Sequence, residues 1–268
     1  MFSHLGSVTG KLGAEKTETM PVVRQISMAD ISDALQLGYA DFKALRSDVI
    51  FICLLYPIIG AVLVWMVIQG SLLPLLFPVI SGFALVGPLA AVGLYEMSRR
   101  RELKLETSWL AFDDVLRSPT FGAIFMLGLC NVVIYIAWLV TASLIYTAIL
   151  GPEPPVSTSA FVLDVLTTKA GWVMGAIGMA VGFAFAVVVL TVSVVSYPLL
   201  LDRNVGLPIA VITSVRVTAK NPGPIAAWGL IVAGSLAIGS VPMLLGLVIV
   251  VPVLGHATWH LYRKAVVE

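Results

Sequence analysis

Two histidines near the C-terminal end are the side chains in this sequence best placed to do chemistry. His256 and His260 lie four positions apart in an apolar stretch, so a helix would put both imidazoles on one face. Imidazoles with this spacing can bind a metal ion, and Glu96, at the end of another apolar stretch, could add a carboxylate. The alternative is a polar cluster in which Glu96, His256, His260 and Tyr262 bond to one another, to backbone or to water. A third reading is a proton- or ligand-handling role, because ionisable groups near a membrane pathway are often functional.

Sequence motifs for catalysis are missing. The sequence contains no phosphate-binding glycine loop, no nucleophile elbow and no HExxH pair. We therefore predict no catalytic residue, no metal site and no cofactor, and we expect the protein not to be an enzyme. The net charge of +1 gives no reason to expect nucleic acid as a partner.

The composition is that of an integral membrane protein. Of the 268 residues, 59% are hydrophobic and only 12% are charged. A soluble domain has roughly 25% charged residues, so this chain could not cover a soluble surface. Cys53 and Cys130 fall in apolar runs, where a thiol usually packs as a small hydrophobic group.

The elements that would position the histidines are long apolar helices. A membrane-spanning helix needs about 20 mainly apolar residues. Prolines inside the first, second and sixth of these stretches predict kinks. The sequence predicts an all-α polytopic membrane bundle with six transmembrane helices, at 49–69, 71–96, 121–149, 171–200, 224–240 and 242–263.

The chain divides into a tail and one membrane domain. Residues 1–22 are predicted to be a disordered cytoplasmic tail, and residues 23–268 a single six-helix membrane domain. An amphipathic helix is expected over 27–46, from a capping-box-like start at Ser27 and Asp30. Asp41 lies mostly off the apolar stripe of this helix. Such a helix would lie on the membrane surface or against the bundle. The stripe consists of Ile31, Leu35, Gly38, Phe42 and Leu45.

The basic residues predict the orientation of the chain. If the N-terminus is inside, every Lys and Arg except Lys169 lies in a cytoplasmic segment. This agrees with the positive-inside rule, so both termini are predicted to be cytoplasmic.

The spans form three repeats, each an amphipathic helix followed by a transmembrane hairpin. The repeats cover about 27–100, 107–203 and 208–264, all in the same orientation. Pro252–Lys264 aligns with Pro88–Arg100 without a gap, which places His260 on Glu96.

Helix packing is predicted chiefly in the fourth span. Small residues let another helix approach closely in a membrane. Asn131, deep in the third span, is expected to bond across to Thr191, Ser193 or Ser196. The small-residue stripe consists of Gly171, Gly175, Gly178 and Gly182.

Four stretches, 21–26, 82–96, 196–203 and 255–263, resemble the domain of unknown function 2189 family of bacterial integral membrane proteins. The resemblance covers about 21–265 and implies a multi-pass protein of the bacterial inner membrane without an established activity. Some members are labelled automatically as cytochrome c oxidase subunit I. Only His256 and His260 lie in membrane helices here, on one helix, so a haem–copper centre cannot be built.

The leading functional hypothesis is a non-enzymatic accessory, assembly or interaction subunit, in one form linked to a respiratory oxidase. One alternative is a small transporter or lipid-handling protein, and a second is metal or haem binding through His256 and His260. The partners expected are membrane lipids and either another membrane protein or further copies of the chain.

Overall fold

The computed structural model describes residues 20–69, 72–107 and 111–267. Most of the predicted disordered tail, residues 1–22, lies outside them. The described chain is helical almost throughout, so the predicted all-α class is confirmed. The strands β1 (Val22–Val23) and β2 (Val266–Val267) pair antiparallel and join the two ends of the chain.

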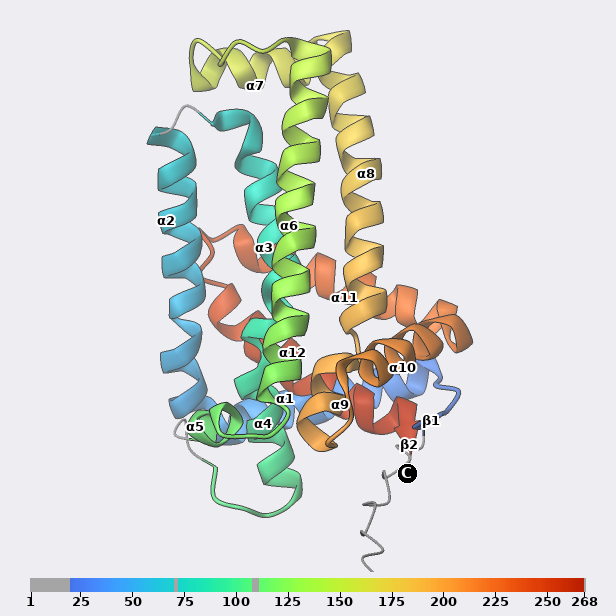
Figure 1. Ribbon diagram of the computed structural model, residues 1–268. Helices are drawn as coiled ribbons and strands as arrows, with labels where there is room; N and C mark the ends of the chain where they lie inside the picture. Colours follow the sequence, from blue (N-terminus) through green and yellow to red (C-terminus); the bar gives the residue numbers. More distant parts are fainter. Residues whose placement is uncertain (1–19, 70–71, 108–110, 268) are drawn as a thin grey trace, which may run out of the picture.

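Four helices run side by side along the long axis of the molecule (Figure 1). Short helices continue two of them toward the end that carries the C-terminus: α4 (Val92–Glu102) follows α3, and α9 (Ser196–Asp202) follows α8. The break between α3 and α4 falls at Ala91, and Pro88 lies within the last turn of α3, where it removes one backbone donor. The four upright helices are α2 (Leu55–Gln69), α3 (Leu76–Ala90, preceded by the 3-10 turn Leu73–Leu75), α6 (Phe121–Leu150) and α8 (Lys169–Ser193).

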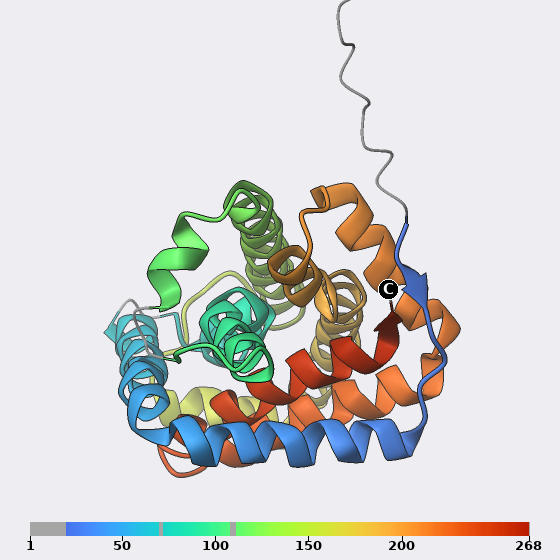
Figure 2. The same cartoon turned by 90° about the horizontal axis from the view of Figure 1, so that it is seen from below.

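The remaining helices lie across this axis. Viewed along the axis, α3, α6 and α8 appear end-on, whereas α1, α11 and α12 appear side-on (Figure 2). We call this layer of crossing helices the base. Only α7 (Thr158–Thr167) lies across the opposite end, among the described helices. The base contains α1 (Met28–Cys53), α5 (Ala111–Leu116), α10 (Leu207–Lys220), α11 (Pro222–Ser240) and α12 (Leu247–Ala265).

The structure supports the membrane class but not every predicted span. Two shorter apolar helices are also present, Pro57–Ile68 and Thr158–Thr167. The first of these overlaps the predicted span 49–69, whereas 242–263 has no counterpart among the candidates. Six spans therefore remain a prediction. By length and composition, 4 helical segments of the described chain could cross a membrane: Leu73–Glu102, Phe121–Leu150, Lys169–Asp202 and Pro222–Ser240.

The main hydrophobic core lies in the base. It gathers buried side chains of α1, α4, α9 and α12, including Ile31, Tyr95, Tyr197 and Trp259. A smaller core, around Trp138, joins α3, α6 and α8. Outside these cores, few side chains of the upright helices are buried. In Lys169–Asp202, only 6% of the apolar 18-residue stretch that could cross a membrane is buried. The base is thus the well-packed part of the molecule, and α8 is largely bare.

The predicted start of the amphipathic helix is confirmed. The backbone N–H of Ser27 donates to the Asp30 carboxylate at 2.8 Å, and the N–H of Asp30 donates to the Ser27 hydroxyl at 3.3 Å. This reciprocal capping box satisfies two backbone donors that a helix start leaves free. The helix then continues beyond the predicted 27–46 to Cys53.

Candidate functional site

Three helix ends converge in the base: α4, α9 and the C-terminal half of α12. Each brings one buried aromatic ring to the meeting point, Tyr95, Tyr197 and Trp259 respectively. Rings of this size dominate the energetics of a core, so they fix the three ends relative to one another.

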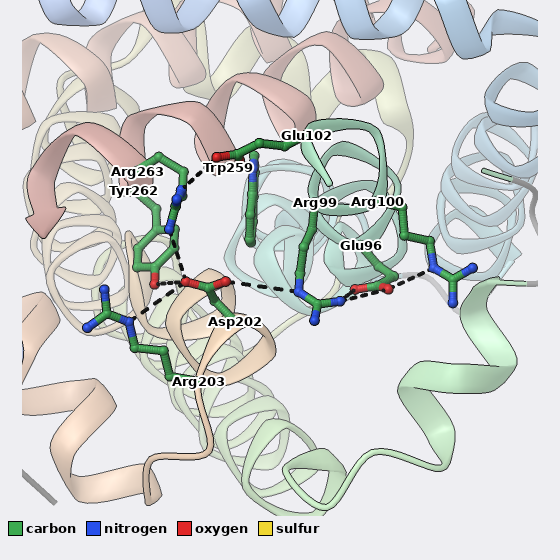
Figure 3. Close-up of polar contacts among 9 residues, drawn as sticks. All are labelled: Glu96, Arg99, Arg100, Glu102, Asp202, Arg203, Trp259, Tyr262 and Arg263. Atoms are coloured by element: carbon green, nitrogen blue, oxygen red, sulfur yellow. Dashed lines mark hydrogen bonds and ion pairs between the residues drawn. The ribbon is translucent and has the colours of Figure 1, made fainter. Parts of the chain in front are cut away.

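Acidic and arginine side chains link these helix ends in one network (Figure 3). Glu96 accepts hydrogen bonds from Arg99 at 3.1 Å and from Arg100 at 2.9 Å, all within α4. Arg100 also pairs with Asp114 of α5. This part of the network ties the end of α4 to the short helix beside it.

Asp202, at the end of α9, is the centre of the second part of the network. The Tyr262 hydroxyl of α12 donates to its carboxylate at 2.7 Å, and Arg263 donates at 3.3 Å. Arg263 also bonds to Glu102 of α4 at 3.1 Å, and the indole N–H of Trp259 bonds to the same carboxylate at 2.9 Å. The network therefore connects α4, α9 and α12 (Figure 3).

The two histidines belong to a separate buried cluster built around Asp41 of α1. One Asp41 oxygen, Oδ2, lies 2.8 Å from Nε2 of His260 and 2.6 Å from the hydroxyl of Ser98. The other, Oδ1, accepts a hydrogen bond from Arg101 at 2.6 Å. The Ser98 oxygen in turn lies 2.7 Å from Nδ1 of His256. We call these five residues the Asp41 cluster.

The proton positions in the Asp41 cluster follow from the number of donors. Burial raises the pKa of the Asp41 carboxyl, but the hydrogen bonds from His260 and Ser98 together lower it by more than burial raises it. The pKa of Asp41 therefore lies below its ordinary value. With Asp41 ionised, the single hydroxyl proton of Ser98 must point to the carboxylate. His256 must then donate from Nδ1. Its Nε2 is left as a buried acceptor with no hydrogen-bond partner in the described chain.

The Asp41 cluster is suited to holding helices together rather than to catalysis. Ser98 is buried and bonds directly to the carboxylate, so a substrate could not reach it as a nucleophile. His256 and His260 turn to different partners, Ser98 and Asp41. Within the described residues, no group of three or more His, Cys, Asp or Glu side chains could hold a metal ion.

An apolar cavity of about 450 Å³ lies between the upright helices and the α11–α12 hairpin. Volumes of 300–1,000 Å³ are typical of small-molecule sites. Its hydroxyl groups already have partners: Ser193 bonds to Asn131, Ser240 to the Leu236 carbonyl and Thr258 to the Leu254 carbonyl, with Tyr95 beside Thr258. A molecule in this cavity would therefore meet an almost wholly hydrocarbon wall.

Comparison with known families finds a match over part of the chain. Residues 76–202 match the family described as "Predicted integral membrane protein (DUF2189)". The predicted resemblance to this family is confirmed over these residues. No curated protein and no solved structure matches the chain.

The DUF2189 match includes α3, α4, α6, α8 and α9, and therefore the Glu96 and Asp202 carboxylates of the network. Asp41, His256, His260 and Tyr262 lie outside the matched residues. The C-terminal stretch 255–263, one of the four that carry the resemblance, also lies outside the matched residues, so its part of the resemblance stays a prediction.

The structure separates the four residues predicted to form one polar cluster. No hydrogen bond or ion pair of the described chain joins Glu96 to a histidine, and Tyr262 bonds to Asp202 instead. The carboxylate beside the histidines is Asp41, which was expected to lie mostly off the apolar stripe of its helix but is only 6% exposed. In the sequence, the position of Asp41 next to Phe42 of that stripe was the one indication that its side chain could be buried.

In the predicted glycine stripe on α8, only the two end glycines pack closely against another helix. Gly171 lies against the backbone of α7 near Asp164, and Gly182 faces the ring of Trp138 on α6. Gly175 and Gly178 have no heavy atom within 4 Å of the position of an added Cβ. The middle of the stripe thus has no partner within the described chain.

Asn131 is fully buried between α6 and α8. Its amide donates to Ser193 at 3.2 Å, one of the three partners expected, and to the hydroxyl of Tyr197 at 3.1 Å. Tyr197, the first residue after the expected partner Ser196 on α9, was not among the expected partners.

Proposed function

We propose that this DUF2189 protein is a non-enzymatic, lipid-handling membrane protein that holds an apolar chain, such as a phospholipid acyl chain, in the cavity beside α8. The cavity of about 450 Å³ and its apolar lining are the observation that supports this. Because the lining is mainly apolar and its hydroxyl groups bond within the protein, the walls favour hydrocarbon over a polar substrate. Glu96, His256 and His260 do not line it, so it is not a transport pathway through the histidines.

Filling the cavity tests this proposal, and α8 offers a matched pair of alanines. Ala186 lines the cavity, whereas Ala184 is exposed and does not. The protein would be purified in mild detergent, and native mass spectrometry would count bound phospholipid. We expect wild type and Ala184→Trp to retain one lipid and Ala186→Trp to lose it. Equal retention by both variants, or no lipid on the wild type, would contradict the proposal.

A second candidate function, an interaction subunit, is favoured by the bare surface of α8. With only 6% of its apolar window buried and open space above Gly175 and Gly178, α8 could receive a helix of another membrane protein. A pull-down from native membranes tests this with Gly175→Leu/Gly178→Leu, which would block close approach. A stoichiometric partner lost in the variant supports the idea. A partner retained by the variant, further copies of the chain alone, or no partner at all counts against it.

The repeat and the location are also parts of this proposal. The meeting of α4, α9 and α12, each with a buried aromatic, supports a threefold relationship between the repeats. We place the protein in the bacterial inner membrane with the C-terminal ends of α4, α9 and α12 on the cytoplasmic side, where the Arg99–Arg101 run is in keeping with the positive-inside rule. Six full crossings, or four upright segments with one hairpin, would both leave the two termini on that side.

A further inference from the structure

The hairpin formed by α11 and α12 differs in direction from the upright helices. The sequence predicts that it crosses the membrane twice, with the turn between the helices on the far side. In the structure both helices lie across the long axis, and their connection, residues 241–246, reaches α2 (Figures 1 and 2).

One contact fixes the height of this connection. A Cβ added at Gly60 of α2 would lie 2.5 Å from Cδ1 of Leu244, so Leu244 occupies the space that glycine leaves free. Beyond Gly60, α2 continues to Gln69. At 1.5 Å per residue, about 13 Å of helix rises above the contact. The hydrocarbon core of a bilayer is about 30 Å thick, so the connection stops close to its middle.

The side chains of the connection suit hydrocarbon and not water. Val241 is 82% exposed and Met243 86% exposed, and Leu245 is also exposed. The sequence from Asn221 to Tyr262 contains no Asp, Glu, Lys or Arg. A turn on the aqueous face would leave these apolar side chains in water, which is unfavourable in proportion to their area.

The backbone of the connection is also compatible with a bilayer interior. The N–H groups of Met243, Leu244 and Leu245 donate to the carbonyls of Val241, Ser240 and Pro242 at 2.9, 3.1 and 3.0 Å. Met243 and Leu244 adopt positive φ angles of 52° and 68°, which close the turn without a polar turn residue. Irregular backbone at membrane depth needs such internal hydrogen bonds.

We propose that α11 and α12 form a re-entrant hairpin. It enters the bilayer from the face that carries both termini and turns near the middle, with residues 241–246 against lipid acyl chains. This does not depend on what the cavity holds. Both the re-entrant and the six-span arrangement keep the termini on one side, so only the depth of the connection distinguishes them.

Spin labels at matched positions of the full-length chain in phospholipid vesicles measure that depth. The labelled variants, each in a Cys53→Ala/Cys130→Ala background, are Met243→Cys, Val62→Cys near the level of Gly60, Ile68→Cys near the end of α2, and Val156→Cys at the far end. The depth follows from the ratio of collisions with oxygen to collisions with a water-soluble nickel complex. A melting curve of each labelled variant checks that it folds.

We expect the label at Met243 to match the one at Val62: high oxygen and low nickel accessibility, and a depth near the bilayer centre. Val156 is expected to show the reverse, and Ile68 to be shallower than Val62. A label at Met243 as shallow as Ile68, or as accessible to nickel as Val156, would overturn the proposal and favour six full crossings.

Discussion

Gly38 of α1 lies directly against the backbone of Ala257 of α12. A Cβ atom at position 38 would stand 2.5 Å from the amide nitrogen of Ala257, which is closer than real Cβ contacts. The two helices lie side by side in the base (Figure 2). Three residues after Gly38, Asp41 reaches His260 of the same neighbouring helix. Glycine at 38 therefore permits the close approach that brings the Asp41 cluster together.

The first prediction follows from this contact. Gly38→Ala should destabilise the protein, by about 1–3 kcal/mol as for other overpacked sites, because the atoms it meets are backbone and cannot rotate away. The measurement is reversible unfolding in mild detergent. Gly175→Ala is the control, since nothing lies within 4 Å of its Cβ position. It should be neutral or slightly stabilising, by up to about 1 kcal/mol from helix propensity. Equal losses in both variants would mean that α1 does not pack closely on α12.

The second prediction concerns the buried carboxylate. Asp41→Asn removes the charge that pairs with Arg101 and accepts from His260 and Ser98. Losing the charged acceptor typically costs about 1–3 kcal/mol through the buried groups that donate to it, whereas the Arg101 side chain is 40% exposed and stays solvated. Asp33→Asn is the control on the same helix, where an exposed carboxylate pairs with Lys264 at 3.2 Å. It should cost less than about 1 kcal/mol. If the two variants unfold alike, the Asp41 cluster does not hold the base.

The third prediction is the pH dependence that Asp41 imposes. Its pKa in the folded protein lies below the ordinary 3.8, so it stabilises the fold above that pH, and the stability is lost as pH falls through the folded value. The part of the acid decline in melting temperature that Asp41 contributes should therefore appear below about pH 4. Asp41→Asn should reduce this decline without abolishing it, because hydrogen bonding by Ser27 also lowers the pKa of Asp30. An unchanged acid profile in the variant would contradict the assignment.

The membrane class and most helix positions could be predicted because they depend on local composition. Long apolar runs between charged segments are visible in any window of about 20 residues, and α6 and α8 lie where expected. The capping box at Ser27 is likewise a local pattern. Direction is not local: a run long enough to cross a bilayer can equally lie across the bundle, as α11 does.

The contents of the site could be predicted only in part for the same reason. The helical spacing of His256 and His260 identified two of the polar side chains of the base. It could not supply their partner, because Asp41 lies on a helix distant in the sequence and is buried only by packing against α12. A helix with one apolar stripe was expected, lying on the membrane surface or against the bundle. In the structure α1 is covered on its Asp41 side as well.

The fourth prediction tests the buried amide between α6 and α8. Asn131→Leu should cost about 1–3 kcal/mol, because it leaves the buried hydroxyls of Ser193 and Tyr197 without this partner. Thr141→Ala, on the exposed side of α6, should change stability by less than about 0.5 kcal/mol.

A double-mutant cycle with Ser193→Ala separates the hydrogen bond from loss of packing. Once Ser193 has no hydroxyl, replacing Asn131 no longer strands that group, so the double variant should lose less than the sum of the single variants. Contacting residues typically show a coupling of about 0.5–3 kcal/mol. Additive losses would mean that the amide contributes through shape alone. Coupling that persists after Tyr197→Phe would assign it to the α6–α8 contact rather than to α9.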